Sequence, residues 1–349
     1  MSVVVTSTAA APTPSPRRRW GRRRAWGILV LVVALLGVSF LSVTFGARAV
    51  GWHDIWAGLG GAIDTAGAAA VNKRIPRTVL AIAVGAALGV AGAVLQGATR
   101  NPLADPQILG INGGAALAVV CGIAFLGLAA PTQYIWTALV GAAVAAVFVY
   151  GIGALGRGGA TPLKLALAGA VTAVAFSSLT SAILLPRVDV MSQFRFWQVG
   201  GVGGATGATI LQVAPFLLVG LVVCLACSPA LNTLALGDEL AAGLGERVRT
   251  ARMVSTLGAV LLCGAATAVA GPIGFVGLVV PHVCRLLIGV DHRWLLPFSA
   301  VAGAVLLTGA DVIGRVIARP EEIEVGIITA LVGAPFFIAI VRRQKVKAL

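Results

Sequence analysis

Charged and aromatic residues are scarce in this 349-residue chain: 11% of its residues are Asp, Glu, Lys or Arg, and 6% are Phe, Trp or Tyr. Hydrophobic residues make up 58%, far from the balance of a soluble globular domain. This composition excludes a separate soluble domain and indicates a membrane protein. The 45 glycines suit helix contacts in lipid, where small residues let backbones approach closely.

The chain also lacks the residues that catalysis or energy coupling would need. It has no G-x-x-x-x-G-K-[ST] motif for ATP, so any ATP must be hydrolysed by a separate subunit. Its three histidines, His53, His282 and His292, have no metal-ligand spacing. The apolar runs contain no chain of acidic residues for a proton relay. We therefore expect no enzyme, no metal site and no cofactor, and a secondary transporter is disfavoured.

Ten apolar runs bounded by charges, prolines and polar clusters predict an all-α polytopic membrane protein with about ten transmembrane helices. The predicted spans are 27–46, 78–98, 107–128, 134–155, 165–185, 208–227, 251–271, 275–289, 294–314 and 325–341. The eighth has the weakest pattern because Pro281, His282 and Arg285 interrupt it. Short or broken helices are tolerated where they line a cavity or are buried in protein.

Basic residues flank these runs, and this explains the net charge of +14 better than nucleic-acid binding does. An even number of spans puts both termini on one side. Both carry basic blocks, within 17–24 and 342–347, so the positive-inside rule makes that side cytoplasmic. We predict a disordered basic cytoplasmic tail over 1–25 and a single transmembrane domain over 26–349, both termini being cytoplasmic.

Two patterns have competing interpretations. The basic block, the apolar run and Ala47-Arg48-Ala49 resemble a cleaved signal peptide, but the apolar run has the length of a full span, which favours an uncleaved helix. Cys224 and Cys227 form a C-x-x-C within an apolar run, where ordinary packing is favoured over redox or metal chemistry.

Four long blocks of sequence carry a resemblance to a known family. They cover 74–114, with RIPRTVLAIAVGAALGVAGAVLQGATRNPLADPQILGINGG, and then 234–245, 271–297 and 310–337. In this order and spacing the chain resembles the FecCD-type permeases of bacterial importers for ferric siderophores, haem and cobalamin. The resemblance implies the architecture of a type II ABC importer permease in the bacterial cytoplasmic membrane. The rivals are an ion-coupled secondary transporter and a membrane-embedded structural subunit.

The resemblance also implies partners and a mechanism. A second permease, identical or paralogous, would complete a central pathway, two ABC ATPase subunits would bind at the cytoplasmic face, and an extracytoplasmic binding protein would deliver the ligand. Transport would proceed by alternating access. A ferric siderophore is the expected cargo, with haem or cobalamin as alternatives. The sequence leaves open the particular ligand, the pathway lining and the choice between homodimer and heterodimer.

A short cytoplasmic helix is predicted within the segment 234–246, with Asp238 capping its start and Gly245 ending it. Its apolar residues would dock into a partner or lie on the membrane surface. In the FecCD-type family the corresponding segment fits a cleft of the ATPase. The positions that the resemblance assigns to this coupling are Leu236, Gly237, Asp238, Glu239, Leu240 and Gly245.

Two further groups of residues are candidates. Arg74, Arg77 and Arg315 lie on the predicted outer side against the positive-inside rule, where they either anchor helix ends or meet an acidic partner. Matching arginines of the family pair with glutamates of the binding protein, which favours docking.

Asn101, Pro102 and Leu103 match the family segment that closes the cytoplasmic end of the pathway, although a plain connector is the alternative. The loop 161–165 aligns with a second gate, but Pro162 and Leu163 depart from residues of some relatives. Glu324 stands where proline is common, so the roles of this loop and of Glu324 stay open.

Overall fold

The computed structural model describes residues 16–105, 107, 110–155 and 162–344. Seven of the described helices are long and apolar enough to cross a membrane, and three more are apolar but shorter, which matches the ten predicted spans. These helices are α1 (Pro16–Thr44), α3 (Ala66–Thr99), α4 (Ile111–Leu126), α5 (Pro131–Ala154), α6 (Pro162–Leu184), α8 (Gly207–Ala226), α11 (Val248–Ala270), α12 (Val276–Ile288), α13 (His292–Ile317) and α14 (Val325–Gln344).

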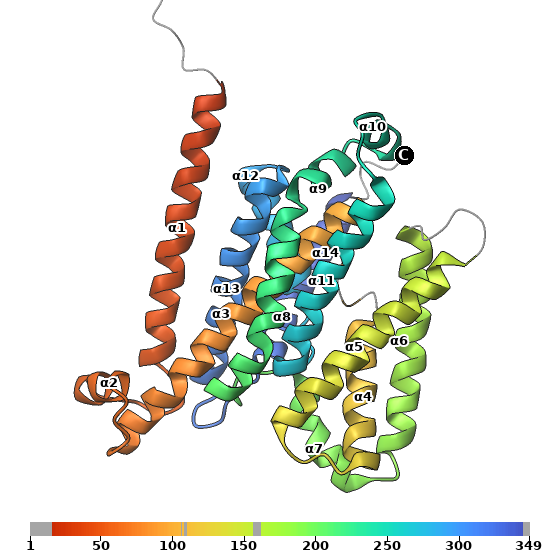
Figure 1. Ribbon diagram of the computed structural model, residues 1–349. Coiled ribbons are helices and arrows are strands. Elements are labelled where there is room, and N and C mark those ends of the chain that lie inside the picture. Colours follow the sequence, from red (N-terminus) through yellow and green to blue (C-terminus); the bar gives the residue numbers. More distant parts are fainter. Residues whose placement is uncertain (1–15, 106, 108–109, 156–161, 345–349) are drawn as a thin grey trace, which may run out of the picture.

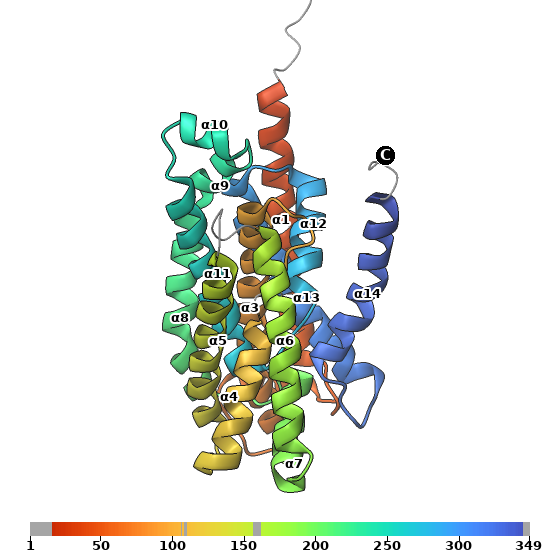
Figure 2. The ribbon, with the colours of Figure 1, turned by 90° about the vertical axis from the view of Figure 1, so that its right-hand side faces the viewer.

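Four short helices connect the long ones: α2 (Trp52–Leu59), α7 (Val188–Val199), α9 (Ser228–Leu234) and α10 (Asp238–Gly243). Only α10 was predicted from the sequence. Figure 1 places α2 and α7 at one end of the bundle, which we call the α2 end, and α9 and α10 at the opposite α10 end. Helix α1 begins and α14 finishes at the α10 end (Figures 1 and 2).

Helix α1 starts earlier than predicted. It begins at Pro16, so the part of the basic block at 17–24 is helical rather than a tail, and its apolar part, Arg24–Thr44, has 21 residues. Only 11% of its apolar window is buried, because α1 lies at the edge of the bundle, as Figure 1 shows. Residues 1–15 of the predicted tail lie outside the described part of the chain. Large apolar side chains on α1 therefore face the hydrocarbon.

Helix α3 is the central element, with 78% of its apolar window buried. It packs against α1, α2, α8, α11, α12 and α13. It also begins before the predicted span, because the Thr65 hydroxyl caps it by accepting a hydrogen bond from the amide of Ala68 at 3.0 Å. Pro76 lies inside the helix without ending it. Arg74 and Arg77 are consequently helical residues rather than loop residues.

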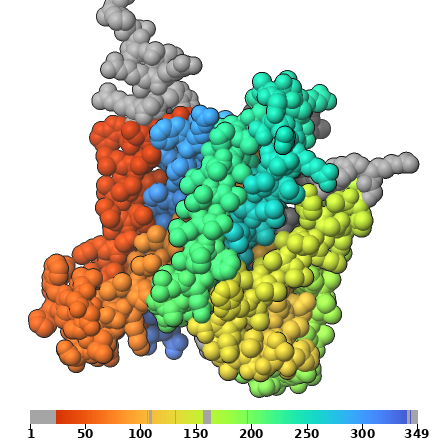
Figure 3. All heavy atoms as spheres, in the orientation of Figure 1, coloured from red at the N-terminus to blue at the C-terminus, as the bar shows by residue number. Residues whose placement is uncertain are grey.

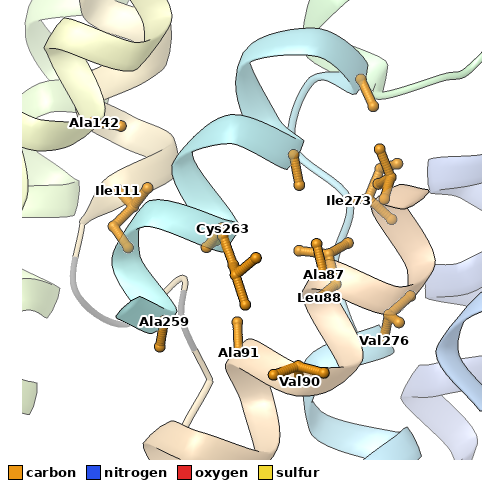
Figure 4. Packing of buried hydrophobic residues seen from close by; sticks show 14 of the residues in the cluster. Ala87, Leu88, Val90, Ala91, Ile111, Ala142, Ala259, Cys263, Ile273 and Val276 are labelled. Carbon is orange, nitrogen blue, oxygen red and sulfur yellow. The ribbon is translucent and has the colours of Figure 1, made fainter. Parts of the chain in front are cut away.

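A pair of glycines, Gly85 and Gly303, lets the backbones of α3 and α13 approach each other closely. A Cβ added at Gly85 of α3 would overlap the backbone of Gly303 in α13, and one added at Gly303 would overlap that of Gly85. Lipid provides no hydrophobic force between helices, so association depends on this kind of backbone approach. Figure 4 shows the neighbouring contact, where Ala87, Leu88 and Ala91 of α3 face Cys263 of α11.

Helices α4, α5 and α6 form a second group of packed helices beside α11. Helix α5 contacts α11, and through this contact the second group joins the central one. Figures 1 and 2 show this group standing to one side of α3 and α13, with α7 across its end. The fold thus has two adjoining groups of helices that meet along α5 and α11.

Candidate functional sites at the two ends of the bundle

A buried charge cluster lies at the α2 end. The carboxylate of Asp311, whose side chain is 1% exposed, accepts hydrogen bonds from Arg77 Nε and Nη2 at 3.0 and 2.8 Å. Arg315 Nη2 lies 2.9 Å from the other oxygen of Asp311. Arg77 Nη1 also donates to Glu322 at 2.6 Å. The buried Asp311 and the exposed Glu322 therefore balance Arg77 and Arg315, and such pairing offsets the cost of burying the two arginines.

The same arginines tie the end of α1 into the bundle. Arg74 donates to the carbonyl oxygens of Val43, Thr44 and Arg48 at 3.1, 2.9 and 2.7 Å. Arg315 Nη1 donates to the carbonyl oxygen of Ser42 at 3.0 Å, and its Nη2 donates to the Ser42 hydroxyl at 2.7 Å. These bonds satisfy carbonyl groups at the helix end that have no partner within the helix. The cluster therefore joins α1, α3 and α13 at this end of the bundle.

The segment around α10 at the opposite end presents three exposed leucines, of which Leu240 lies in the helix itself and the other two flank it. Leu236, Leu240 and Leu244 are 57, 63 and 69% exposed, whereas Ala241 is fully buried against the bundle. Gly237 precedes the helix with a φ of 109°, and Gly245 follows with a φ of 84°, both in the region that favours glycine. The backbone therefore turns sharply on both sides of α10 and leaves its leucines pointing away from the protein.

Asp238 does not cap α10, which corrects the prediction: Gly237 is the N-cap residue, and no side chain caps it. The carboxylate of Asp238 instead accepts from Arg252 Nη2 of α11 at 3.0 Å and lies 3.7 Å from Arg100 Nη2. Arg252 Nε also donates to the carbonyl oxygen of Ala98 at 3.0 Å. Arg252 therefore bridges α10 to the last turn of α3.

The candidate gate follows that last turn directly. Arg100 adopts a left-handed conformation with a φ of 52°, which ends α3. The side-chain oxygen of Asn101 then accepts from the amide of Leu103 at 3.0 Å and fixes the turn through Pro102. Asn101 is exposed, whereas Pro102 and Leu103 are partly buried. The predicted gate is a rigid turn connected to α10 through Arg100.

Beyond this turn, the side chain of Gln107 donates to the carbonyl oxygen of Ile273 at 3.0 Å and joins the segment to the start of α12. Burial raises the pKa of the Asp105 carboxyl, and the amide of Gln107 opposes this by donating to it at 2.9 Å. Of the second gate region, Thr161 lies outside the described residues, and α6 begins at Pro162.

The sequence profile of the FecCD transport family matches residues 32–343. This chain belongs to the FecCD transport family. It is 41% identical over 95% of its length to the iron(3+)-hydroxamate import system permease protein FhuB of Bacillus subtilis (strain 168), of which it covers 88%. It is 40% identical over 92% of its length to the ferric enterobactin transport system permease protein FepD of Escherichia coli (strain K12), of which it covers 96%.

A solved structure supports the same fold for this FecCD protein. An ABC transporter described as metal-chelate type, in an inward-facing conformation, superposes with a TM-score of 0.79 at 26% identity. The match covers 91% of this chain and 99% of the other. The arrangement of ten apolar helices is therefore that of an ABC transporter permease.

The structure places the three predicted docking arginines of this FecCD protein inside the bundle rather than on its surface. Arg74, Arg77 and Arg315 are 7, 9 and 1% exposed, and all their guanidinium groups have internal partners. The reason is the pairing of Arg77 with Asp311, which lies 234 residues away and cannot be found from spacing. Exposed basic residues at this end include Arg48, Lys73, Arg195 and Arg319. The docking role of the three arginines stays a prediction.

Sequence reasoning also missed polar contacts within the FecCD bundle. Arg285 of α12 donates to the side-chain oxygen of Gln96 in α3, whose amide donates to the carbonyl oxygen of Gly277 at 3.0 Å. Asn112 of α4 accepts from Thr267 of α11 at 2.9 Å. The sequence signal that could have indicated the polar contact of Arg285 was its position in the interrupted eighth span. Among the described residues no group of three or more metal-ligating side chains is placed to hold an ion.

Proposed function

We propose that this FecCD protein is the membrane-spanning permease subunit of an ABC importer, and that it carries a ferric siderophore inward by alternating access. The observation that carries the proposal is the family match over 32–343 on a bundle of ten apolar helices. The named relatives act on an iron(3+)-hydroxamate and on ferric enterobactin, which are both ferric chelates. The favoured cargo is therefore a ferric siderophore, with haem or cobalamin as alternatives.

ATP hydrolysis is assigned to two separate ABC ATPase subunits, which would dock at the α10 end. The exposed Leu236, Leu240 and Leu244 support this, because a helix that presents its apolar face to a groove is a common mode of recognition. Glu239, which is exposed, would meet the rim of that groove, and Gly237 and Gly245 would set the direction of the helix.

Coupling would then pass from α10 to the gate. Movement of Asp238 reaches Ala98 and Arg100 through the Arg252 bridge, and both precede the turn of Asn101, Pro102 and Leu103. A shift of α10 would displace this turn and open or close the cytoplasmic end of a pathway formed with a second permease subunit, identical or paralogous. The α10 end, where α1 begins and α14 finishes, is therefore assigned to the cytoplasm.

The α2 end is assigned to the extracytoplasmic side, where a binding protein would deliver the cargo. Arg74, Arg77 and Arg315 hold this end together, and the exposed Lys73 and Arg319 stand beside them as direct partners for acidic residues. Charge pairs across an interface mainly set orientation and encounter rate. Lys73→Glu with Arg319→Glu is expected to slow uptake most at low salt, whereas Arg293→Glu, an exposed change at the α10 end, leaves uptake unchanged.

The function is tested by reconstituting the chain with its ATPase subunits and binding protein in proteoliposomes. Uptake is measured for a panel of ferric hydroxamates, ferric catecholates, haem and cobalamin, with and without ATP. ATP-dependent uptake of a ferric siderophore supports the proposal. Haem or cobalamin uptake alone would change the cargo but keep the permease. Uptake driven by an ion gradient without the ATPase would replace the mechanism, and no ATP-dependent uptake with any panel member would indicate a structural subunit.

A further inference from the structure

A crevice of ≈ 560 Å³ lies between α5 and α11, at the junction between the two helix groups, where the lining side chains of Val147 and Leu257 are exposed. Ala142, Ala146 and Tyr150 line it from α5, and Met253, Leu257 and Val260 line it from α11. Figure 3 shows the side chains of these two helices next to each other on one face of the protein. No residue of the candidate gate or of α10 contributes to it.

The crevice follows from the sizes of the side chains. At its closed end a Cβ on Gly264 would lie 3.3 Å from the Cβ of Ala142, so the two helices are in contact there. Toward the α10 end they diverge, as Figure 1 shows, and the alanines of α5 are too small to fill the space. The groove runs along α5 from Leu139 to Gly151, a length of about 18 Å at 1.5 Å per residue.

These dimensions match half a bilayer. The hydrocarbon core is roughly 30 Å thick, so one leaflet contributes about 15 Å. The lining comes from membrane-spanning helices, and it is apolar apart from Tyr150 and Thr256. An empty groove would leave its lining atoms without van der Waals partners. An acyl chain of a phospholipid has the required length and chemistry, and the surrounding bilayer supplies it.

A basic residue at the open end specifies the head group. Arg249 precedes Met253 by four residues, so it lies one helical turn beyond the lining on the same face of α11. Arg249 is exposed, and within the described residues it forms no ion pair or hydrogen bond through its side chain, not even with Glu246 three residues earlier. Lys164, beside the lining residue Leu165, adds positive charge at the same end while donating to the carbonyl oxygen of Leu155 at 3.3 Å.

We propose that the crevice between α5 and α11 is a binding site for an anionic phospholipid, with an acyl chain along Ala146 and Leu257 and the phosphate against Arg249. A basic residue near the membrane surface favours anionic lipid by ~1 kcal/mol, which is a factor of about five. The bound lipid fills the junction between the two helix groups. The lining contains no residue of α10 or of the candidate gate, so the site can be tested on the chain alone.

The experiment uses the full chain in nanodiscs of phosphatidylcholine. A lipid with a photoactivatable acyl chain is added, and this lipid is either phosphatidylglycerol or phosphatidylcholine. Labelled residues are found by peptide mass spectrometry. Phosphatidylglycerol should label Met253, Leu257 or Tyr150 about fivefold more than phosphatidylcholine does. Arg249→Gln should remove most of the excess labelling by phosphatidylglycerol, whereas Arg247→Gln, at the N-cap position just before α11, should leave the preference intact.

Ala146→Phe should fill the groove and abolish labelling by both lipids, and Val219→Phe on the exposed face of α8 is its matched control. If Ala146→Phe does not fold, Leu257→Trp gives the same blockade from α11. Equal labelling by the two lipids in the wild-type chain would overturn the head-group assignment. Labelling that survives both blocking variants would overturn the site, and so would protection of the groove by a ferric chelate, because the groove would then belong to the transport pathway.

Discussion

Replacing Asp311 by Asn should destabilise the permease more than almost any other polar substitution. Asp311 is 1% exposed and is the shared acceptor of two arginines, through contacts of 2.8 to 3.2 Å from Arg77 and 2.9 Å from Arg315. An Asn side chain is neutral and presents one amide nitrogen where both arginines need an acceptor. Arg315, which is also 1% exposed, would lose its only acidic partner within the described residues.

The cost can be bounded from known buried ion pairs. Removing one partner of such a pair costs about 3–5 kcal/mol, because the remaining charge is left without compensation. Here Arg77 would keep Glu322, and Arg315 would keep the carbonyl oxygens of Ser42 and Phe45. These remaining contacts favour the lower bound, about 3 kcal/mol. For a protein of this size that loss corresponds to a fall of roughly 4 °C in melting temperature.

The assay is the apparent melting temperature of the purified full chain in detergent, followed by size-exclusion fluorescence. Glu321→Gln, an exposed change at the same end, is the control and should stay within about 0.5 kcal/mol of the wild-type chain. An Asp311→Asn chain that melts with the wild-type chain would refute the view that this cluster holds the α2 end together. Arg77→Glu is a poor test of docking, since it would place a third carboxylate beside Asp311 and Glu322.

Three further outcomes are expected. Arg252→Ala should lower cargo uptake about tenfold at unchanged ATPase activity, whereas Arg247→Ala, an exposed change, should not. Equal uptake by the Arg252→Ala variant and the wild-type chain would exclude a role of the Arg252 bridge in coupling. Gly303→Ala should cost roughly 1–3 kcal/mol in thermal unfolding, and Gly309→Ala, whose added Cβ would meet only Val38 at 3.9 Å, should cost little. Burial raises the pKa of Glu324, so stability should fall as pH rises from about 4.5 through that raised pKa, and Glu324→Gln should abolish this slope.

The sign of the Glu324 prediction follows from proton binding. With a raised pKa, the folded chain binds more protons than the unfolded chain across that window, so protonation favours the fold. No described residue donates a hydrogen bond to Glu324 Oε2, which agrees with a cost for the ionised form. An unchanged pH dependence after Glu324→Gln would show that another group carries it.

The spans were predictable because each depends on a local run of apolar residues. Helix α2 was missed because its eight residues include Asp54 and His53, which break an apolar pattern. The burial of Arg77 was missed for a different reason. Its partner Asp311 is distant in sequence, and the same positive charge would have suited a surface contact.

In the segment around α10, too, the position of the helix was predictable from local sequence, whereas a side-chain contact was not. The location of α10 and its flanking glycines followed from sequence signals, but the prediction that Asp238 caps the helix was wrong. A cap and an ion pair compete for one carboxylate, and Arg252 of α11 lies near enough to take it. Local rules therefore predict where a helix lies, whereas tertiary neighbours decide what its polar side chains do.

The length and burial of α3 would let it transmit movement from one end of the bundle to the other. At 1.5 Å per residue its 34 residues form a rod of about 50 Å, which is bonded to Asp311 through Arg77, about a third of the way along, and to Arg252 through Ala98 in its last turn. If α3 tilted as a rigid rod, its close contact with Gly303, near the middle of the helix, would be the pivot. A tilt of about 5° around its middle would move each end by about 2 Å in opposite directions. Events on one side of the membrane would thus be felt on the other without any change in the helix itself.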